Sequence, residues 1–377
     1  MWIESKEFEN SHFTTRLKYK LLNESYLNEN GVIKPEYKFT ITLPEFKIKD
    51  SKVIGKPDDK FETMLFLPEG EGRKGEGGLR TKGYFKFSYK LMEDGLWYMC
   101  DLDGNPVKPA PEDVQESIKD YLKGLKERNT EVDLDKIREL PLITVITVVL
   151  NGEKYFEETI ESVINQTYPN VEYVIIDGGS TDNTLNIINK YGDYIDYWVS
   201  EKDCGLYYAM NKGLRLSLGR FYIMAGDSDK LLADSISNII HFIDKDTDIC
   251  ICAVFKNSKR LFYYRPYLFF LGPGYAYPSH SVGCIIKTML HKKEGLYDTS
   301  YKVLADSLFI GTIIKNGYKI VFQNVALGIF DTSGISSKLD VFAILELFRM
   351  NLSLKNSPKI LQILLLILRL IKNIKKI

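Results

Sequence analysis

The sequence predicts an α/β protein in which helices cover a largely parallel sheet. Residues 143–150 form a continuous apolar and β-branched run, which is typical of a strand buried on both faces. A second such run covers residues 171–176, and the segment between them, 154–166, has helical periodicity. Strand, helix and strand therefore make one crossover unit of a parallel sheet.

Polar side chains follow both predicted strands. Asn151 and Glu153 come directly after the first strand, Asp177 ends the second, and Asp182 stands five residues further on. The carboxyl ends of parallel strands meet at one edge of a sheet, where ligands of such sheets bind. We therefore expect these four side chains to lie close together.

The same pattern continues along the chain to a pair of aspartates. The further elements predicted are helices over 184–191 and 206–218 and strands over 195–199 and 221–225. Asp227 and Asp229 follow the last of these strands, one residue apart, so their carboxylates point the same way and suit a hard divalent cation that carries phosphate oxygens. A turn with solvated aspartates is the alternative interpretation.

Composition limits the remaining possibilities. The chain has 377 residues, 45% of them hydrophobic, and a formal net charge of zero, so nothing global indicates a nucleic-acid partner. Its five cysteines include no CxxC pair, which favours reduced thiols in a cytoplasmic protein. The amino terminus is too polar for a signal peptide, and no apolar run reaches the about 20 residues that span a bilayer.

Residues 1–140 differ in character and are predicted to be a small α+β amino-terminal region of unknown role. Short alternating segments at 39–46 and 60–67 indicate small strands. The glycine-rich segment 70–83 carries four basic side chains but lacks the pattern of a nucleotide-binding loop, so an exposed loop or linker is favoured over a phosphate site. The other predicted elements are a hairpin turning at Asp103–Gly104 and a helix over 111–128.

Four segments of the central part resemble, in order, the family 2 glycosyltransferases of the GT-A fold: TVVLNGEKYFEETIESVINQTY, VEYVIIDGGSTDNT, SEKDCGLYYAMNKG and AGDSDKL. The resemblance covers about residues 141–337. It implies a GT-A domain that transfers a sugar, with inversion, from a nucleotide-diphosphate donor such as a UDP-hexose or UDP-N-acetylhexosamine, with Mn2+ or Mg2+ as cofactor. The acceptor it implies is a glycan or lipid-linked saccharide of surface polysaccharide or glycolipid synthesis.

The resemblance also implies roles for individual residues. The positions that match donor-binding residues are Asn151, Glu153, Asp177, Asp203 and Asp227, with Asp177 on the base. Asp227 and Asp229 match the metal motif. Many members carry Asp-Asp here rather than Asp-x-Asp, so either carboxylate is a candidate for the direct metal ligand. His280 matches a segment near the acceptor, with a structural histidine as the alternative, and DTSGISS from Asp331 resembles a stretch that closes the site.

Inverting transfer needs a base that takes the proton of the acceptor hydroxyl. Asp306 lies near the start of an apolar helix predicted over 301–314, where a carboxylate needs a reason to be present. Its position after GLYDTSYK resembles the acid-bearing helix of the family, so Asp306 is the predicted base. A helix cap or a hydrogen-bonding core residue is the alternative for Asp306, and Asp298 is a weaker competitor for the role.

The segment 338–377 ends in an apolar and then basic run that predicts an amphipathic helix. About a dozen nearly uninterrupted apolar residues after Pro358 are followed by Arg369, Lys372, Lys375 and Lys376. Such a helix favours the surface of an anionic membrane, here the inner face, and packing against protein is the alternative.

Two other classes stay open from sequence alone. A nucleotidyltransferase shares the crossover sheet and the metal carboxylates, but its Gly-rich, basic first loop is missing after Leu150. A non-catalytic module that binds a sugar nucleotide or a partner protein would keep the donor residues and have no need of Asp306.

Overall fold

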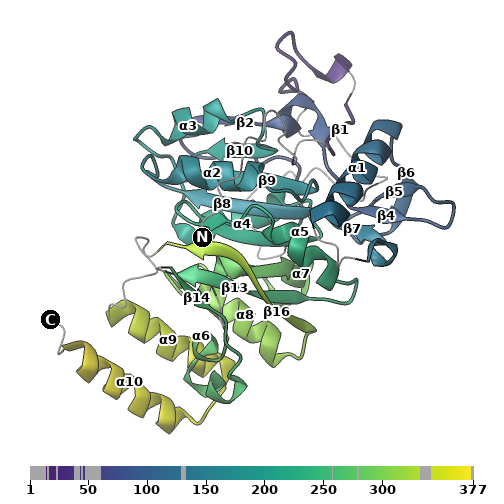
Figure 1. Cartoon of the computed structure of the whole chain (residues 1–377). Helices are drawn as coiled ribbons and strands as arrows, with labels where there is room; N and C mark the ends of the chain where they lie inside the picture. Colours follow the sequence, from purple (N-terminus) through teal and green to yellow (C-terminus); the bar gives the residue numbers. More distant parts are fainter. Residues whose placement is uncertain are drawn as a thin grey trace.

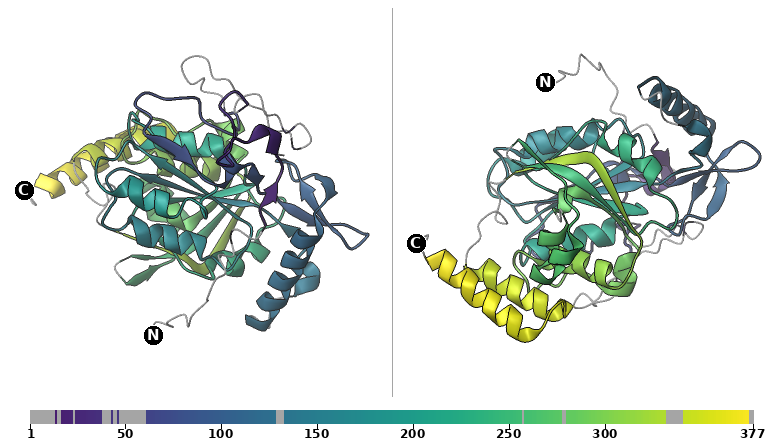
Figure 2. Two further views of the ribbon diagram at one scale, coloured as in Figure 1. Left: turned by 90° about the horizontal axis from the view of Figure 1, so that it is seen from above. Right: turned by 60° about the horizontal axis from the view of Figure 1, so that its bottom comes forward.

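A ten-stranded mixed sheet forms the centre of the computed structural model, with helices on both sides of it (Figures 1 and 2). The structure describes residues 14, 17–22, 24–37, 43, 46, 61–128, 133–256, 258–277, 280–331 and 341–374. Most of the strand predicted over 39–46, and residues 332–337 of the predicted closing stretch, lie outside the described residues. The strand order is β12-β16-β13-β15-β11-β8-β9-β10-β2, with β14 paired to β13.

The predicted crossover units are confirmed. Four adjacent parallel strands are β11 (Phe221–Gly226), β8 (Ile143–Val149), β9 (Val171–Asp177) and β10 (Tyr197–Ser200). The helices between them are α2 (Phe156–Ile164), α3 (Thr184–Lys190) and α4 (Leu206–Leu216). Val149 pairs with Asp177, and Asp177 with Ser200, so the carboxyl ends of three strands meet at one edge of the sheet. This is where the sequence places the candidate site.

Close packing of α4 on the sheet depends on a glycine. A Cβ atom on Gly213 would lie 2.4 Å from Cγ2 of Ile146, well inside van der Waals contact. The helix can therefore approach β8 only because residue 213 has no side chain. The apolar residues of the neighbouring α2, among them Phe156 and Ile160, are fully buried against the core, as their helical spacing predicts.

The other half of the sheet is mixed. Its strands are β12 (Lys230–Leu231), β13 (Ile249–Lys256), β14 (Lys259–Leu261), β15 (Cys284–Lys287) and β16 (Ile320–Phe330). β15 runs antiparallel to both β11 and β13, so the parallel arrangement is limited to the four central strands and the β13–β16 pair. β16 pairs with β12, which follows the predicted metal motif, and so brings a distant part of the chain to that motif.

Part of the amino-terminal region belongs to this large sheet. β2 (Gly75–Gly77) is its edge strand and pairs antiparallel with β10. Cβ atoms on Gly75 and Gly77 would lie 2.9 and 2.7 Å from the indole of Trp198, so both glycines are needed for close contact. The favoured interpretation of residues 70–83 as an exposed loop or linker is therefore wrong, because sequence composition does not show close backbone packing. The strand predicted over 60–67 is also wrong, since residues 61–67 are irregular.

Two buried ion pairs hold the same region to the sheet. Nη2 of Arg80 lies 2.6 Å from Oε1 of Glu172 in β9, and both side chains are almost completely buried. Nζ of Lys86 lies 2.8 Å from Oδ2 of Asp196, and it also donates to the carbonyl of Val171. Residues 80–86 therefore share a core with the central strands.

The remaining elements surround this core. A four-stranded sheet consists of β4 (Tyr89–Leu91), β5 (Trp97–Cys100), β6 (Pro106–Pro109) and β7 (Glu139–Leu140), with α1 (Glu112–Arg128) nearby, which confirms the predicted hairpin and helix. β1 (Tyr19–Lys20) pairs with β3 (Tyr84–Phe85). The short helices are η2 (Glu24–Tyr26), η4 (Leu79–Lys82), η5 (Leu134–Lys136), α5 (Ser235–Ile239), η6 (Ile240–Phe242), η7 (Pro266–Leu271), α6 (Pro273–Ala276), η8 (Ser281–Gly283) and α7 (Leu290–Glu294).

Three longer helices complete the carboxyl-terminal part. They are α8 (Ala305–Lys315), α9 (Val341–Leu354) and α10 (Lys359–Ile374). Figure 1 shows α9 and α10 side by side at the edge of the molecule, away from the small amino-terminal sheet. Within the described ranges, the structure contains no helix with the length and apolar character needed to cross a membrane.

Candidate active site

Hydrogen bonds join the loops that follow β8 and β9. Asn151 has a positive φ of 56°, a conformation that asparagine tolerates better than most residues. Its Oδ1 accepts a hydrogen bond from the backbone N–H of Thr181 at 2.8 Å, and its own N–H donates to Oγ of Ser180 at 2.7 Å. Oε2 of Glu153 accepts the N–H of Asn183 at 3.1 Å. The two residues predicted after the first strand therefore fix the shape of the loop after the second.

Asp177 is completely buried at the end of β9. Its carboxylate accepts the N–H of Ser180 at 3.1 and 3.2 Å, and also the hydroxyls of Ser180 and Ser200. These donors satisfy a buried carboxylate that would otherwise be costly. Asp177 thus orders the turn that carries Gly178 and Gly179.

Asp203 lies against that turn from the next loop. A Cβ atom on Gly178 would come within 2.7 Å of Oδ2 of Asp203, so the glycine allows the approach. Burial raises the pKa of Asp203, and the nearby charges of Asp177 and Glu201 raise it further, while the N–H of Gly205 and the charge of Lys212 oppose the rise. The structure therefore brings together the predicted residues Asp177 and Asp203.

The Asp-x-Asp pair meets a third aspartate. Oδ2 of Asp229 accepts the N–H of Gly226 at 2.8 Å, and its Oδ1 accepts the N–H of Asp331 at 3.2 Å. Burial raises the pKa of Asp229 to about 6, with further contributions from the charges of Asp227 and Asp331. Burial also raises the pKa of Asp227, again with a contribution from Asp331. The charges of neighbouring carboxylates thus add to the effect of burial on Asp227 and Asp229.

Asp227 also faces the loop after β8. A Cβ atom on Gly152 would lie 3.4 Å from Oδ2 of Asp227, so this carboxylate lies beside the turn that contains Asn151 and Glu153. The backbone carbonyl of Asp227 accepts a hydrogen bond from the Thr159 hydroxyl of α2 at 2.9 Å. The predicted donor and metal residues therefore belong to one edge of the sheet.

The oxygen-rich cluster fits a hard divalent cation in its chemistry. Carboxylate oxygens are the ligands that Mg2+ and Mn2+ prefer, and a cation would relieve the repulsion among these carboxylates, which adds to the effect of burial on their pKa values. Within the described ranges, however, no group of three or more His, Cys, Asp or Glu side chains already has the geometry to hold a metal. Oxygens from a diphosphate would have to complete the coordination of any cation bound by Asp227 or Asp229.

Asp306 lies in the first turn of α8 and is half-buried. Its Oδ1 accepts the hydroxyl of Tyr207 at 3.0 Å and the N–H of Ser307 at 2.8 Å. Burial raises the pKa of Asp306, and these two hydrogen bonds oppose the rise. Tyr207 begins α4, two residues after Gly205, so Asp306 is held near the loop that carries Asp203.

Asp306 follows the N-cap residue Leu304, and its carboxylate accepts the first-turn N–H of Ser307, as the helix-cap alternative expects. The backbone N–H groups before α8, at Lys302, Val303 and Leu304, donate to the carboxylate of Glu346 from α9, at 2.9 Å for Val303 and 3.2 Å for Leu304. The competitor Asp298 is a turn residue whose Oδ1 accepts the N–H of Ser300 at 2.9 Å. Glu346 therefore binds the backbone that leads into α8, and Asp306 binds a backbone N–H within its first turn.

His280 stacks on Phe330, with the ring centroids 4.2 Å apart. Burial and the nearby charge of Lys256 lower the pKa of His280 to about 4, so the ring is neutral at pH 7. Phe330 ends β16 directly before Asp331, which places His280 next to the strand end that meets Asp229.

Comparison with known proteins agrees with this geometry. The sequence profile described as glycosyl transferase family 2 matches residues 144–304. The chain carries a family 2 glycosyltransferase domain. The matched range contains the predicted residues Asn151, Glu153, Asp177, Asp203, Asp227, Asp229 and His280, whereas Asp306 lies two residues beyond it.

Individual relatives match parts of the chain. An uncharacterised glycosyltransferase of Rickettsia typhi is 30% identical over 181 residues, which are 44% of this chain and 56% of the relative. The Escherichia coli UDP-Glc:alpha-D-GlcNAc-diphosphoundecaprenol beta-1,3-glucosyltransferase WfaP is 33% identical over 108 residues, 27% of this chain and 43% of the relative. The chain thus spans about half the length of the curated relatives it matches. Among solved structures, TarS 1-349 of S. aureus in complex with UDP-GlcNAc has a TM-score of 0.47 at 19% identity, and the match covers 59% of this chain and 69% of that TarS fragment.

The glycosyltransferase domain receives an unpredicted contribution from the amino-terminal region. Nζ of Lys74 donates to the carbonyls of Gly179 and Ser180 at 2.9 and 2.7 Å. The preceding Arg73 donates through Nε to Oε2 of Glu201 at 2.8 Å, and Lys212 of α4 donates to Oε1 of the same carboxylate at 2.7 Å. These side chains hold the turns on either side of Asp177 and Asp203.

Sequence reasoning did not identify these residues as part of the site. Lys74 lies more than 100 residues before the carbonyls that it contacts, and no local pattern links the two segments. The sequence contains a weak indication that Asp331 belongs to the site. Like Asp177 and Asp227, it is a carboxylate at the carboxyl end of a strand of this sheet.

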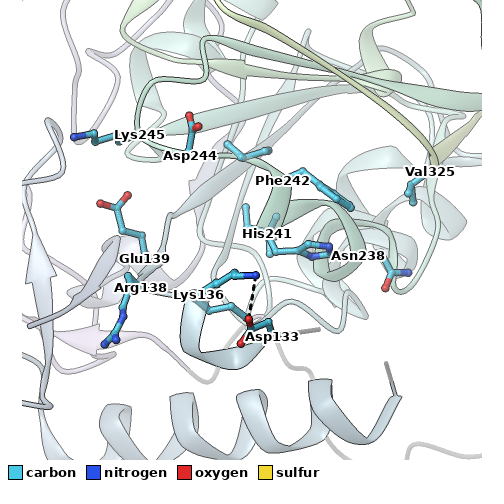
Figure 3. Close-up of a pocket in the computed structure, with 13 residues that line it drawn as sticks. Asp133, Lys136, Arg138, Glu139, Asn238, His241, Phe242, Asp244, Lys245 and Val325 are labelled. Carbon is cyan, nitrogen blue, oxygen red and sulfur yellow. Dashed lines mark ion pairs between the residues drawn. The ribbon is translucent and has the colours of Figure 1, made fainter. Parts of the chain in front are cut away.

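A separate pocket lies between the segment that precedes β8 and the helices that precede β13. It has a volume of about 840 Å³ and is lined by residues of η5, β7 and η6, including Lys136, Glu139 and His241 (Figure 3). These residues precede β8 and β13, so the pocket lies at the amino ends of those strands. None of the predicted site residues lines it.

Proposed function

We propose that the chain is an inverting, metal-dependent glycosyltransferase. The donor is a nucleotide-diphosphate sugar, UDP-hexose or UDP-N-acetylhexosamine, and the acceptor is a glycan or lipid-linked saccharide of surface polysaccharide or glycolipid synthesis. One observation carries the proposal. The carboxyl ends of β8, β9 and β11 bring Asp177, Asp227 and the loop that begins at Asn151 to one edge, and Tyr207 joins the helix after β10 to Asp306.

The donor would lie along this edge. Asp203 and the turn ordered by the buried Asp177 form its nucleoside side, where the base can be recognised by hydrogen bonding, and Asn151 and Glu153 shape the loop beside it. Asp227 and Asp229 face the diphosphate. A bound Mg2+ or Mn2+ would act as a Lewis acid that stabilises the leaving diphosphate. WfaP, which is similar to part of this chain and is named for UDP-Glc as its donor, supports a UDP-sugar as donor.

Asp306 would be the general base. The acceptor hydroxyl gives its proton to the carboxylate as its oxygen forms the bond to the anomeric carbon, and the bond from that carbon to the diphosphate breaks with its electron pair on the diphosphate. Both hydrogen bonds to Asp306 from Tyr207 and Ser307 are accepted by Oδ1, so Oδ2 is the oxygen that we assign to the proton. The raised pKa of Asp306 makes it a stronger base than an exposed aspartate.

His280 would lie on the acceptor side. The ring is neutral at working pH because its pKa is about 4, so it can donate one hydrogen bond and accept another without adding charge. Its stacking on Phe330 holds the plane of the ring beside the strand end at Asp331. Contact with an acceptor hydroxyl or with the diphosphate is the role that this position supports.

The test is nucleoside diphosphate release from a panel of UDP- and GDP-sugars with Mn2+, with and without a membrane lipid extract. Wild type is expected to turn over one UDP-sugar, and Asp306→Asn to lose about 10²- to 10⁴-fold in rate while keeping donor affinity. Asp229→Ala is expected to lose both turnover and the Mn2+ requirement for donor binding. Asp298→Asn is the matched control and should keep wild-type turnover.

Other outcomes would favour the alternative classes. Pyrophosphate release would identify a nucleotidyltransferase. Donor binding without turnover in every acceptor mixture, unchanged by Asp306→Asn, would favour a non-catalytic module and would falsify the proposed mechanism.

A further inference from the structure

The last helix of the structure presents an apolar face to solvent. Its exposed apolar side chains are Ile360, Ile363, Leu364, Ile367, Leu368 and Ile371, which follow the i, i+3, i+4, i+7 spacing of one helix face. The exposed fractions are large, 54% for Leu364 and 62% for Leu368. A contiguous apolar stripe of this kind on the surface marks an interaction site.

The opposite face of α10 is held to the protein by polar groups. Gln362 is fully buried, and its Nε2 donates to the carbonyl of Phe270 at 2.7 Å while its Oε1 accepts from Asn351 at 3.1 Å. Nη2 of Arg369 donates to the carbonyl of Leu271 at 3.0 Å. An ordinary surface helix buries its apolar face, whereas α10 buries a glutamine and exposes leucines. The hydrogen bonds of Gln362 and Arg369 fix the apolar face toward solvent.

The neighbouring helix extends the surface. Val341, Phe342 and Leu345 of α9 are also exposed, and both helices lie at the edge of the molecule in the right-hand view of Figure 2. The two helices α9 and α10 form a helical hairpin, and the charges at its ends are positive. Lys355, Lys359 and Lys372 are exposed, and residues 359–374 contain no acidic side chain. Apolar area combined with positive charge complements an anionic bilayer better than it complements a second copy of the same basic surface.

We propose that α9 and α10 form a docking surface for an anionic lipid bilayer. The 16 residues of α10 extend about 24 Å at 1.5 Å per residue, which is less than the roughly 30 Å hydrocarbon core. The helix therefore lies in the interface, with its isoleucines and leucines among the acyl chains and its lysines at the headgroups.

This surface is bonded to the candidate catalytic helix. Glu346 of α9 accepts the backbone N–H groups before α8, whose first turn carries Asp306. Docking of the hairpin would thus hold the proposed base close to the plane of the membrane, where the saccharide of a lipid-linked acceptor is presented. This consequence rests on the proposed function, whereas lipid binding itself does not.

Vesicle flotation of the full chain tests the proposal without donor or acceptor. Wild type should float with vesicles of phosphatidylcholine mixed with phosphatidylglycerol and bind phosphatidylcholine alone more weakly. Leu364→Ser/Leu368→Ser should weaken binding to the mixed vesicles at least ~10-fold. Lys359→Glu/Lys372→Glu should reduce the difference between the two vesicle types. Leu96→Ser/Phe242→Ser, which changes two comparably exposed apolar side chains outside the hairpin, is the matched control and should bind as wild type.

Two results would overturn the proposal. One is a folded Leu364→Ser/Leu368→Ser variant, checked by circular dichroism, that floats as well as wild type. The other is a wild type that does not float but forms dimers in light scattering that the same substitutions disperse, because the apolar face would then be a contact between copies. Neither result depends on sugar transfer, so failure here is distinct from failure of the proposed function.

Discussion

The hydroxyl of Tyr207 donates a hydrogen bond to Oδ1 of Asp306 across 3.0 Å. The two residues are 99 positions apart, one at the start of α4 and the other in the first turn of α8. The bond connects the helix that follows the predicted donor loop with the helix that carries the predicted base.

Tyr207→Phe removes this hydrogen bond and keeps the ring. The bond favours the charged carboxylate, so its loss should raise the pKa of Asp306 further. A base works only when deprotonated, so the acid limb of the pH–rate profile should move to higher pH. We expect the limb to move by roughly one pH unit, in line with the loss of a hydrogen bond to a charged group. An unchanged profile would show that the bond has no part in the reaction.

Glu346→Gln should act in the opposite direction. The charge of Glu346 contributes to the raised pKa of Asp306, and glutamine keeps an oxygen for the backbone N–H groups before α8. The acid limb should therefore move to lower pH, where wild type is already losing activity. Steady-state rates between pH 4 and pH 8 measure it, and a shift in the same direction as for Tyr207→Phe would contradict the electrostatic assignment.

The raised pKa of Asp229 should make the stability of the protein depend on pH, and a bound cation should reverse this effect. Its folded-state pKa of about 6 lies above the ordinary value of 3.8, so its contribution to stability is fully present below pH 3.8 and is lost as pH rises through 6. Relative to Asp229→Ala, the free energy of unfolding of wild type should fall by up to about 3 kcal/mol between pH 4 and pH 7. Urea denaturation of both proteins measures the difference in the free energy of unfolding. The pH dependence that comes from carboxylates present in both proteins cancels in this difference.

The same protein pair tests cation binding. Mn2+ binds the folded state with Asp229 ionised, so it should raise the midpoint of urea unfolding of wild type at pH 7.5 and leave Asp229→Ala unchanged. An equal effect of Mn2+ on both proteins would place the cation elsewhere.

The buried ion pair between Arg80 and Glu172 indicates that the amino-terminal region stabilises the glycosyltransferase domain. Arg80→Met leaves Glu172 buried without its partner, which typically costs about 3–5 kcal/mol in the free energy of unfolding. Arg80→Met/Glu172→Gln removes both charges and should recover part of the loss. Lys82→Met, which removes an exposed ion pair to Asp193, is the control and should change stability by less than about 1 kcal/mol.

Lys74 predicts that this region also shapes the donor site. Lys74→Met removes the two hydrogen bonds to the carbonyls of Gly179 and Ser180, so the turn after Asp177 should become less well ordered. We expect a three- to tenfold loss of UDP affinity in titration calorimetry, the usual effect of losing a net hydrogen bond of about 1 kcal/mol. Lys119→Met, on the exposed face of α1, should bind UDP as wild type does.

The parallel strands and their helices could be predicted from the sequence. Runs such as 143–150 are buried on both faces and are therefore apolar throughout. Such a run can be recognised in the sequence without knowledge of the tertiary structure. Asp177 and Asp227 stand at the carboxyl ends of such runs, so topology alone brings them to one edge. The resemblance of four ordered segments added the expected chemistry, and the family of the domain over 144–304 was correctly predicted.

Only the tertiary structure decided the remaining relationships. Asp331 meets Asp229 because β16 pairs with β12, Lys74 meets Ser180 because β2 pairs with β10, and Glu346 meets the start of α8 through helix packing. Each contact joins segments more than 40 residues apart through one to three hydrogen bonds, which leave no periodicity or motif in either segment. The glycines at 75 and 77 show the same limit, since their composition suggested a loose loop and their packing against Trp198 requires a close one. The burial of a strand or helix can be predicted from its own sequence, whereas contacts between distant segments depend on how the strands pair.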